Sequence, residues 1–293
     1  MRVRLSWLVI GAALLCASVA AQQPPAAGQQ PAAGRGGQRG GAPLPQGQNP
    51  NGMHVYIYAG LKSHGEGQHD YPQLLADWSK ILTTHGAVVD GSLHFPLAQE
   101  LTKTDVVVIY KGDAGYMTPE EKTTLEAYVK RGGGLVSFHD SLCGPEPDYF
   151  ASMVGGGKKH GEVNYSAGKL NYSIVDKANP IMAGMSDFAI DDEAFMLMTW
   201  APAGMHALAT VPMPNGSHAG EVVPQIWTYE HTVPGGQPAR AFVWMQGHTY
   251  TNFVNPQVEP MILRGIAWAG KKPVNELTDY KPAARGGRAG GQN

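Results

Sequence analysis

The chain has 293 residues, of which 43% are hydrophobic and 16% are charged, and its formal net charge is −2. This length and apolar content are enough for one sizeable folded domain or two small ones. The near-neutral charge argues against a nucleic-acid partner, because a nucleic-acid surface needs a clustered excess of Lys and Arg.

The N-terminus has the pattern of a secretory signal peptide. Arg2 and Arg4 form a positive segment, residues 5–15 are apolar but too short for a membrane span, and small residues follow. We expect cleavage near Ala20 or Ala21 and export to the periplasm or the exterior. The mature protein then has no integral membrane segment.

The two cysteines bear on the compartment and on stability. Cys16 lies in the leader, where a lipoprotein signal is disfavoured because Leu15 occupies a position that requires a small residue. After cleavage Cys143 is the last cysteine, so the domain has no internal disulfide. Cys143 is then either a small buried side chain or a free thiol.

Composition divides the chain into four segments. Residues 22–52 are rich in Gln, Pro, Ala and Gly, and they carry too few apolar side chains to offset the entropy of ordering. A similar Gly-rich tail closes the chain. We therefore predict a signal peptide (1–21), a disordered linker (22–52), a folded domain (53–280) and a disordered tail (281–293).

The first half of the folded part alternates apolar runs with helical periodicity. Thr118, Pro119 and Glu121 form a capping box that opens the second helix, and Gly132 ends it. The order strand, helix, strand, strand, helix, strand is typical of a parallel sheet with right-handed crossovers. The predicted strands cover 54–59, 87–90, 105–110 and 135–138, and the predicted helices cover 71–85 and 118–131.

The second half is predicted to be rich in strands that complete the sheet. A short helix at 149–154 precedes them, and a final helix runs over 261–269. The last two strands are separated by Pro234-Gly-Gly, which favours a hairpin. The strand candidates are 170–176, 195–200, 205–211, 225–230 and 240–246.

Several histidines and carboxylates follow predicted strands. His139 and Asp140 end the strand 135–138, His69 and Asp70 lie in the loop after the first strand, and His248 follows the strand 240–246. Ligands of open α/β sheets bind beyond the carboxyl ends of the strands, so these side chains are expected at one edge. His160, in a Gly-rich loop, and Glu193, in the predicted polar loop 191–193, are expected to join them.

Imidazole and carboxylate groups at one place suggest two chemistries. One is a divalent metal site, with a metal such as zinc held by His139, His160, His248 and Glu193. The other uses no cofactor and relies on histidine as a general acid or base, because its pKa lies near neutrality. The remaining histidines are interpreted as structural or surface residues: His54, His85, His94, His206, His218 and His231.

Two other functional motifs are absent. Gly155-Gly-Gly-Lys-Lys lacks the spacing of a phosphate-binding loop. The chain also has no G-x-S-x-G elbow of a serine hydrolase.

Five segments together resemble the ThuA-like (trehalose utilisation) family: 132–139 (GGGLVSFH), His160, 192–193, 247–248 and 265–269 (GIAWA). The resemblance extends over about residues 54–271. It implies a flavodoxin-like three-layer α/β sandwich, similar to class I glutamine amidotransferases, with a mainly parallel sheet and a β-rich second half.

The sequence departs from the amidotransferases at the nucleophile. Their catalytic cysteine stands on the turn after the strand that corresponds to 135–138, where this chain has His139, Asp140 and Ser141. Cys143 lies four residues after His139 and outside any elbow motif. The resemblance therefore does not carry over glutaminase activity.

The ThuA-like resemblance implies a role in carbohydrate catabolism, on disaccharides or 3-keto-glycosides. The polar positions that match the family are His69, Asp70, His139, His160, Glu193 and His248. The leading hypothesis is acid–base or metal-assisted elimination or hydrolysis. His139, His248, His160 and Glu193 are its catalytic candidates, with His69, Asp70 and Asp140 as supporting or substrate-contacting residues.

The alternative hypothesis is a sugar-binding module without turnover. Trp227 and Tyr229 are candidates for a sugar-stacking surface, although core packing explains them equally well. The oligomeric state, monomer or homo-oligomer, stays open.

Overall fold

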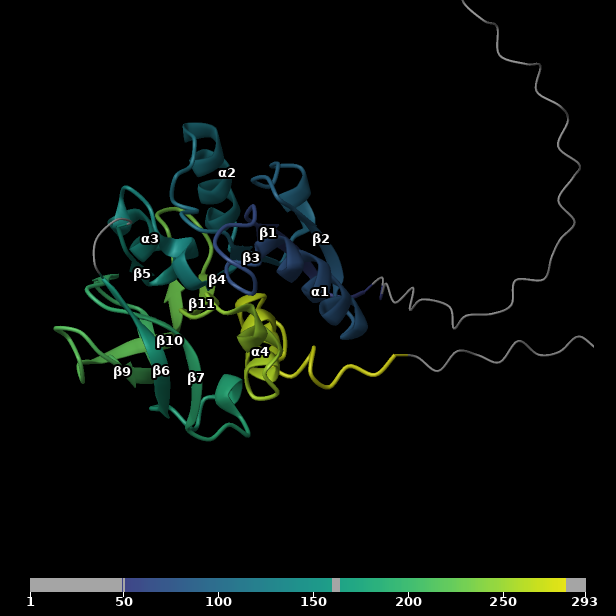
Figure 1. Ribbon diagram of the computed structural model, residues 1–293. Helices are drawn as coiled ribbons and strands as arrows, with labels where there is room; N and C mark the ends of the chain where they lie inside the picture. The colour runs from purple at the N-terminus through teal and green to yellow at the C-terminus, as the bar shows by residue number, and fades with distance from the viewer. Residues whose placement is uncertain (1–48, 50, 160–163, 283–293) are drawn as a thin grey trace, which may run out of the picture. The chain divides into compact units, whose positions relative to one another are not determined.

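One mixed sheet forms the centre of the molecule (Figure 1). The structure is a computed structural model that describes residues 49, 51–159 and 164–282. The predicted signal peptide, nearly all of the linker and most of the predicted tail lie outside these residues, as does His160. The sheet comprises β1 (His54–Ala59), β2 (Val88–Ser92), β3 (Val106–Tyr110), β4 (Gly134–Phe138), β6 (Tyr165–Ile174), β7 (Phe188–Phe195), β9 (Met205–Pro212), β10 (Val222–His231) and β11 (Ala239–Trp244).

The strand order explains how the two halves of the chain share this sheet. The order is β2-β1-β3-β4-β11-β10-β9-β6-β7, and the first five of these strands pair in parallel. The pairs from β11 to β7 are antiparallel. The expected hairpin of β10 and β11 is confirmed, and β11 lies beside β4 in the middle of the sheet. A small second sheet pairs β5 (Gly156–Gly157) with β8 (Thr199–Trp200).

Helices cover both faces of the parallel part, which gives three layers. The helices are α1 (Tyr71–Thr84), α2 (Pro119–Lys130), α3 (Pro147–Val154) and α4 (Val258–Ala269). Trp78 of α1 and Ile262 of α4 belong to one buried cluster, and Leu125 of α2 and Phe150 of α3 belong to another. Successive strand residues point to opposite faces, so β1, β3, β4 and β11 contribute to both clusters. This arrangement is the predicted flavodoxin-like sandwich.

Local sequence explains where the helices begin. The hydroxyl of Thr118 accepts a hydrogen bond from the amide of Glu121, whose carboxylate accepts one from the amide of Thr118, so the predicted capping box is present. Pro72 lies in the first turn of α1, where a missing N–H breaks no helical bond.

One predicted loop is wrong. Residues 191–193 were expected in a polar loop before a strand at 195–200, but they belong to β7, which begins at Phe188 and ends at Phe195. Asp191, Asp192 and Glu193 pair with Lys169, Gly168 and Ala167 of β6. Backbone pairing with a long neighbouring strand outweighs the low intrinsic strand propensity of three consecutive carboxylates.

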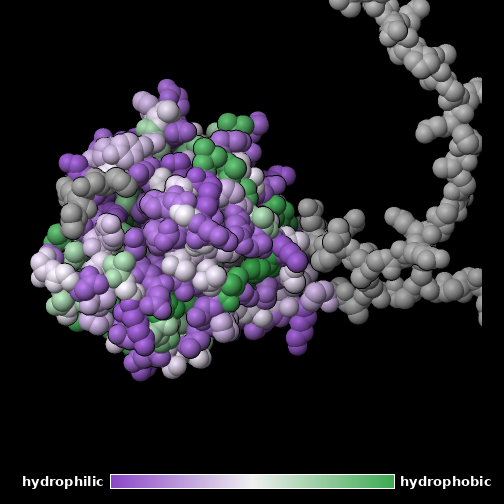
Figure 2. Space-filling model, in the orientation of Figure 1, coloured by the Kyte–Doolittle hydropathy of each residue, from purple (hydrophilic) through white to green (hydrophobic). Residues whose placement is uncertain are grey.

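The face of the molecule seen in Figure 2 is mostly hydrophilic, with small separate hydrophobic patches. Within the described residues, no helix is long and apolar enough to cross a membrane.

Candidate metal centre

His139 occupies the turn directly after β4, at the carboxyl edge of the parallel strands. Its side chain is only 1% exposed, and its backbone has φ 54°, a left-handed conformation that is uncommon for a residue with a side chain. The ring Nδ1 lies 3.4 Å from the carbonyl oxygen of Met245. A carbonyl can only accept, so Nδ1 carries the hydrogen and the Nε2 lone pair points away from Met245.

His69 ends the loop that connects β1 to α1. Its amide donates to the carbonyl of His248 (3.0 Å), which ties this loop to the segment after β11. The ring Nδ1 lies 3.0 Å from Tyr71 Oη, and the Tyr71 hydroxyl donates to Asp140 Oδ1 (3.3 Å). When Tyr71 donates its hydroxyl proton to Asp140, its oxygen can accept the hydrogen of His69 Nδ1, and Ser63 Oγ lies 3.0 Å from the same nitrogen and can accept it as well. In this tautomer the Nε2 lone pair of His69 faces the other histidines.

His248 follows β11 and is held by the buried carboxylate of Asp192. This carboxylate accepts from the amides of Gly247 (3.3 Å), His248 (3.2 Å) and Thr249 (3.3 Å), and from Asn252 Nδ2 (2.7 Å). The loop after β11 thus wraps around one side chain from β7.

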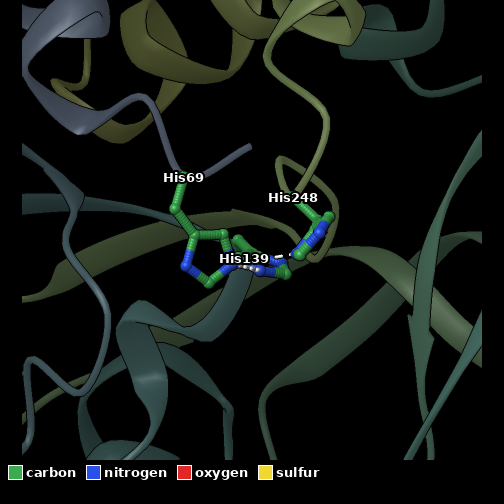
Figure 3. A group of neighbouring side chains, drawn as sticks. All are labelled: His69, His139 and His248. Atoms are coloured by element: carbon green, nitrogen blue, oxygen red, sulfur yellow. Dashed lines mark hydrogen bonds between the residues drawn. The ribbon is translucent and has the colours of Figure 1, made fainter. Parts of the chain in front are cut away.

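The three imidazole rings converge on one point (Figure 3). His69 Nε2 lies 2.9 Å from His139 Nε2 and 3.0 Å from His248 Nδ1. All three nitrogens lie within 4.8 Å of one another. Two nitrogens bound to the same zinc at 2.0–2.1 Å can lie at most about 4.2 Å apart, so both contacts of His69 fit a shared ion.

The hydrogen-bond pattern shows why this cluster suits a cation. When the ring hydrogens of His69 and His139 are on their outer Nδ1 atoms, the inner Nε2 lone pairs face each other across 2.9 Å. Two lone pairs at this distance repel unless a proton or a metal ion lies between them. Histidines that bind a metal through one ring nitrogen usually donate the N–H of the other nitrogen to a neighbouring acceptor. The outer nitrogens of His69 and His139 lie beside such acceptors, a hydroxyl and a carbonyl oxygen.

Carboxylates surround the histidine cluster. Glu193 Oε2 lies 3.8 Å from His139 Nε2, Glu193 Oε1 lies 3.5 Å from His248 Nδ1, and Asp140 Oδ1 lies 3.9 Å from His139 Nε2. Burial raises the pKa of Glu193, and a proton on the neighbouring His139 would oppose this effect. Burial also opposes ionisation of Asp140, but His139, His69 and Lys158 together lower its pKa.

Burial favours the neutral forms of His69 and His248. It lowers the pKa of His69 from 6.5 to about 3, and the neighbouring His139 adds to this effect. The pKa of His248 is lowered for the same two reasons. A neutral imidazole is the form that binds a metal, so these residues are ready to act as ligands near neutral pH.

The structure brings together His69, His139, His248, Glu193 and Asp140 from the predicted set. His69, predicted as a supporting residue, occupies the centre of the cluster. Asp70 instead forms an ion pair with Lys62. His160 lies outside the described residues.

Two further predicted features belong to the core. Trp227 is fully buried on the face covered by α2 and α3, and its indole donates to the carbonyl of Val154 (2.8 Å), so core packing explains it better than sugar stacking. Tyr229 is in the same cluster and only 6% exposed. Cys143 is a free, buried thiol whose pKa is raised by burial, which does not favour a thiolate nucleophile.

Four further residues belong to the site, and two of them, Tyr71 and Lys158, were not identified from the sequence. Tyr71 is the first residue of α1, and its position in the sequence indicates a core aromatic residue. The sequence around Asp192 indicates a turn. His64 is exposed, with its ring centroid 3.9 Å from that of His69. Lys158 is 6% exposed, and its ammonium lies 3.9 Å from the ring centroid of Phe195. His64, in the same loop as His69, and Asp192, beside Glu193, each offered a signal in the sequence.

The fold and the cluster define an α/β protein with histidines gathered at the carboxyl edge of its sheet. The sequence matches the model of the ThuA family, described as trehalose utilisation, over residues 55–269. The chain therefore belongs to the ThuA family, which associates it with carbohydrate metabolism.

Two solved structures share this fold. A ThuA-like protein from Bacteroides uniformis ATCC 8492 is 18% identical with a TM-score of 0.56, covering 74% of this chain and 91% of its own. A ThuA-like protein from Parabacteroides merdae ATCC 43184 is 20% identical with a TM-score of 0.55, covering 75% and 91%. A search of curated proteins gives no significant match.

Proposed function

We propose that this protein is a metal-dependent enzyme that cleaves glycosides carrying a keto group on the sugar ring. The observation that carries this proposal is the convergence of His69, His139 and His248, whose inner nitrogens lie within 4.8 Å of one another. Three imidazoles are an established ligand set for a catalytic divalent ion that keeps a position open for water or substrate. The family's association with trehalose utilisation supports a glycoside as substrate.

The carboxylate of Glu193 is suited to remove a proton beside the cluster. It lies 3.5 and 3.8 Å from two of the imidazole nitrogens and is partly open to solvent. A carbonyl at C3 of a sugar ring acidifies the hydrogen on C2. When a base takes that proton, the C2–H electron pair forms a C1–C2 double bond and the C1–O bond breaks. The departing oxygen takes up a proton, and later addition of water to the double bond completes hydrolysis.

The cluster would stabilise the negative charge on the carbonyl oxygen while C2 loses its proton. A bound divalent ion supplies Lewis-acid polarisation of that carbonyl. His69, His139 and His248 would hold the ion. Tyr71 and the carbonyl of Met245 would fix the rings of His69 and His139.

The test combines elemental analysis with an assay on 3-keto-trehalose. We expect about one equivalent of a divalent metal, and loss of metal and of turnover by at least about a hundredfold in His139→Ala and His248→Ala. His206→Ala is the matched control, because His206 pairs with Asp176 away from the cluster. Full turnover in the two cluster variants would overturn the proposal. Binding of glycosides by the native protein without any turnover would instead identify a sugar-binding module.

We also propose that the protein acts outside the cytoplasm. The signal-peptide pattern of residues 1–21 supports this location. N-terminal sequencing of the mature protein should begin near residue 21 or 22, and an intact Met1 would contradict export.

A further inference from the structure

A cavity of about 400 Å³ opens beside the histidine cluster. Polar side chains from two loops line it: Ser63 and His64 after β1, and Lys111 and Asp113 after β3. His69 belongs to both the cavity and the cluster, and Asp140, whose Oδ1 lies 3.9 Å from His139 Nε2, also lines the cavity. The cavity therefore opens next to the place where the chemistry would occur. Its volume lies within the range of sites that hold a small ligand.

The walls carry charges of both signs. The Lys111 ammonium donates to the carbonyl oxygens of Gly112 (3.1 Å) and Asp113 (3.3 Å), and the lysine is half-buried. Ser63 Oγ lies 3.1 Å from His64 Nδ1 and 3.0 Å from His69 Nδ1. One ammonium, two carboxylates and the Ser63 hydroxyl offer both donors and acceptors, and the excess of carboxylates over the ammonium disfavours an anion. This combination suits a neutral ligand with many hydroxyl groups.

Backbone conformation marks the same region. Left-handed φ values occur at His64 (65°), His69 (44°) and Asp113 (57°), which line the cavity, and at His139 (54°) in the adjoining cluster. In the described chain these are four of six non-glycine residues with positive φ. Such conformations cost free energy and concentrate at functional sites.

We propose that this cavity is the subsite for an intact, neutral pyranose unit of the glycoside, next to the ring that reacts at the histidine cluster. The inference rests on the proposed function, because it assumes a glycoside substrate. Lys111 and Asp113 act as specificity-determining residues that bind ring hydroxyls. The subsite favours uncharged sugars over sugar phosphates, since its two carboxylates repel an added anion.

The first experiment measures the affinity of the zinc-loaded protein for methyl α-glucoside and trehalose by calorimetry. We expect Lys111→Met and Asp113→Asn to weaken binding at least tenfold while the zinc content stays unchanged. Both replacements preserve the backbone, because Asn tolerates the left-handed conformation of residue 113 and Met matches the length of the lysine stem.

Two matched controls come from a second cavity of about 400 Å³ beside α2, which is lined by Glu126 and Lys130. Lys130→Met and Glu126→Gln should bind both probes like the native protein. Leu61→Trp gives an independent variant, because Leu61 borders the proposed subsite and is 72% exposed, so a larger side chain can narrow the opening without disturbing the core. It should also weaken binding.

The outcomes separate this inference from the proposed function. Native affinity in Lys111→Met, Asp113→Asn and Leu61→Trp would overturn the subsite, even if zinc binding and turnover persist. Tighter binding of glucose 6-phosphate than of methyl α-glucoside would overturn the preference for an uncharged ring. If the native protein binds neither methyl α-glucoside nor trehalose, the proposed subsite is also overturned. The proposed function is tested separately, by metal content and by turnover of the keto-glycoside.

Discussion

At the residue scale, the position of a single proton decides whether His69 can bind a metal. When Tyr71 donates its hydroxyl proton to Asp140, its oxygen can accept the Nδ1 proton of His69, and this tautomer leaves the Nε2 lone pair for the cluster. The carboxylate thus acts on the imidazole through the tyrosine. A carboxyl group next to a histidine in the sequence, such as Asp70, does not fill this role here.

We expect Tyr71→Phe to lower zinc affinity about 10- to 100-fold, the usual effect of removing a hydrogen-bond partner of a metal-ligating histidine. The aromatic ring stays, so the packing of α1 should be preserved. Competition with a chromogenic chelator measures the affinity. Tyr56→Phe removes a hydroxyl that contacts Ser92 (2.8 Å) and should leave zinc binding unchanged. Equal affinities in the two variants would show that the Tyr71 hydroxyl does not orient His69.

His231, at the end of β10, offers a residue-scale test of stability against pH. Both of its ring nitrogens are buried and have no hydrogen-bond partner within the described structure, and its ring stacks on Tyr229 at 4.5 Å. Burial lowers its pKa below 6.5. The unfolded chain therefore takes up a proton at a higher pH than the folded chain does, so stability is lost as the pH falls below about 6.5.

His231→Phe keeps the stacked ring and removes this titration. Urea unfolding at pH 7.5 and 5.5 should show a smaller loss of unfolding free energy in the variant. The change of unfolding free energy with pH should differ between the native protein and the variant by up to about 1.4 kcal/mol per pH unit, the value for one proton. Parallel stability curves would mean that His231 titrates alike in the folded and unfolded states.

At the scale of elements, β7 fixes the loop after β11 although the two strands lie far apart in the sheet order. Besides the loop amides held by Asp192, Gln246 Nε2 donates to the Glu193 carbonyl (3.0 Å) and to Gln225 Oε1 of β10 (2.8 Å). This polar network links the antiparallel strands to the carboxyl edge of the parallel ones. It thereby places Glu193 beside His139 and His248.

We expect Asp192→Asn to weaken zinc binding at least tenfold and to destabilise the fold by about 2–4 kcal/mol. An amide group directs its own hydrogens at some of the backbone donors that the carboxylate satisfies, which leaves buried N–H groups unpaired. Asp191→Asn is the matched control, because Asp191 is the exposed neighbour on the same strand. Denaturant unfolding and chelator competition measure the two effects. A native-like Asp192→Asn protein would contradict the positioning role of Asp192.

At the scale of the whole molecule, the metal would join three distant parts of the chain. His69, His139 and His248 follow β1, β4 and β11, so one ion would fasten the loops at the carboxyl edge of the sheet. Binding to the folded state alone stabilises it by mass action. The unfolded chain has no such preformed arrangement.

Free zinc a hundredfold above its Kd should stabilise the protein by about 2.7 kcal/mol and raise its Tm by roughly 5–10 °C. Calorimetry with added zinc or with EDTA measures this shift. In His139→Ala the two conditions should give the same Tm. A zinc-dependent Tm in that variant would place the binding site elsewhere.

Much of the fold could be predicted from the sequence because its signals are local. Apolar runs, helical periodicity, the capping box at Thr118 and the glycines after the helices each act over a few residues, and most elements were located from them within a few residues of their ends. The clustering of His69, His139 and His248 was also predictable, since parallel strands bring their carboxyl ends to one edge.

The rest required the tertiary structure. Asp192 is a buried hydrogen-bond acceptor instead of a turn residue because it lies within β7, which pairs with β6. The role of Tyr71 depends on its contact with Asp140, 69 residues away. Strand register and side-chain direction decide which polar groups face each other, and both are set by packing across the sheet. The sequence by itself therefore determined the elements and the edge at which the histidines gather. Only the tertiary structure decided which lone pairs converge, because that depends on hydrogen bonds between residues far apart in the chain.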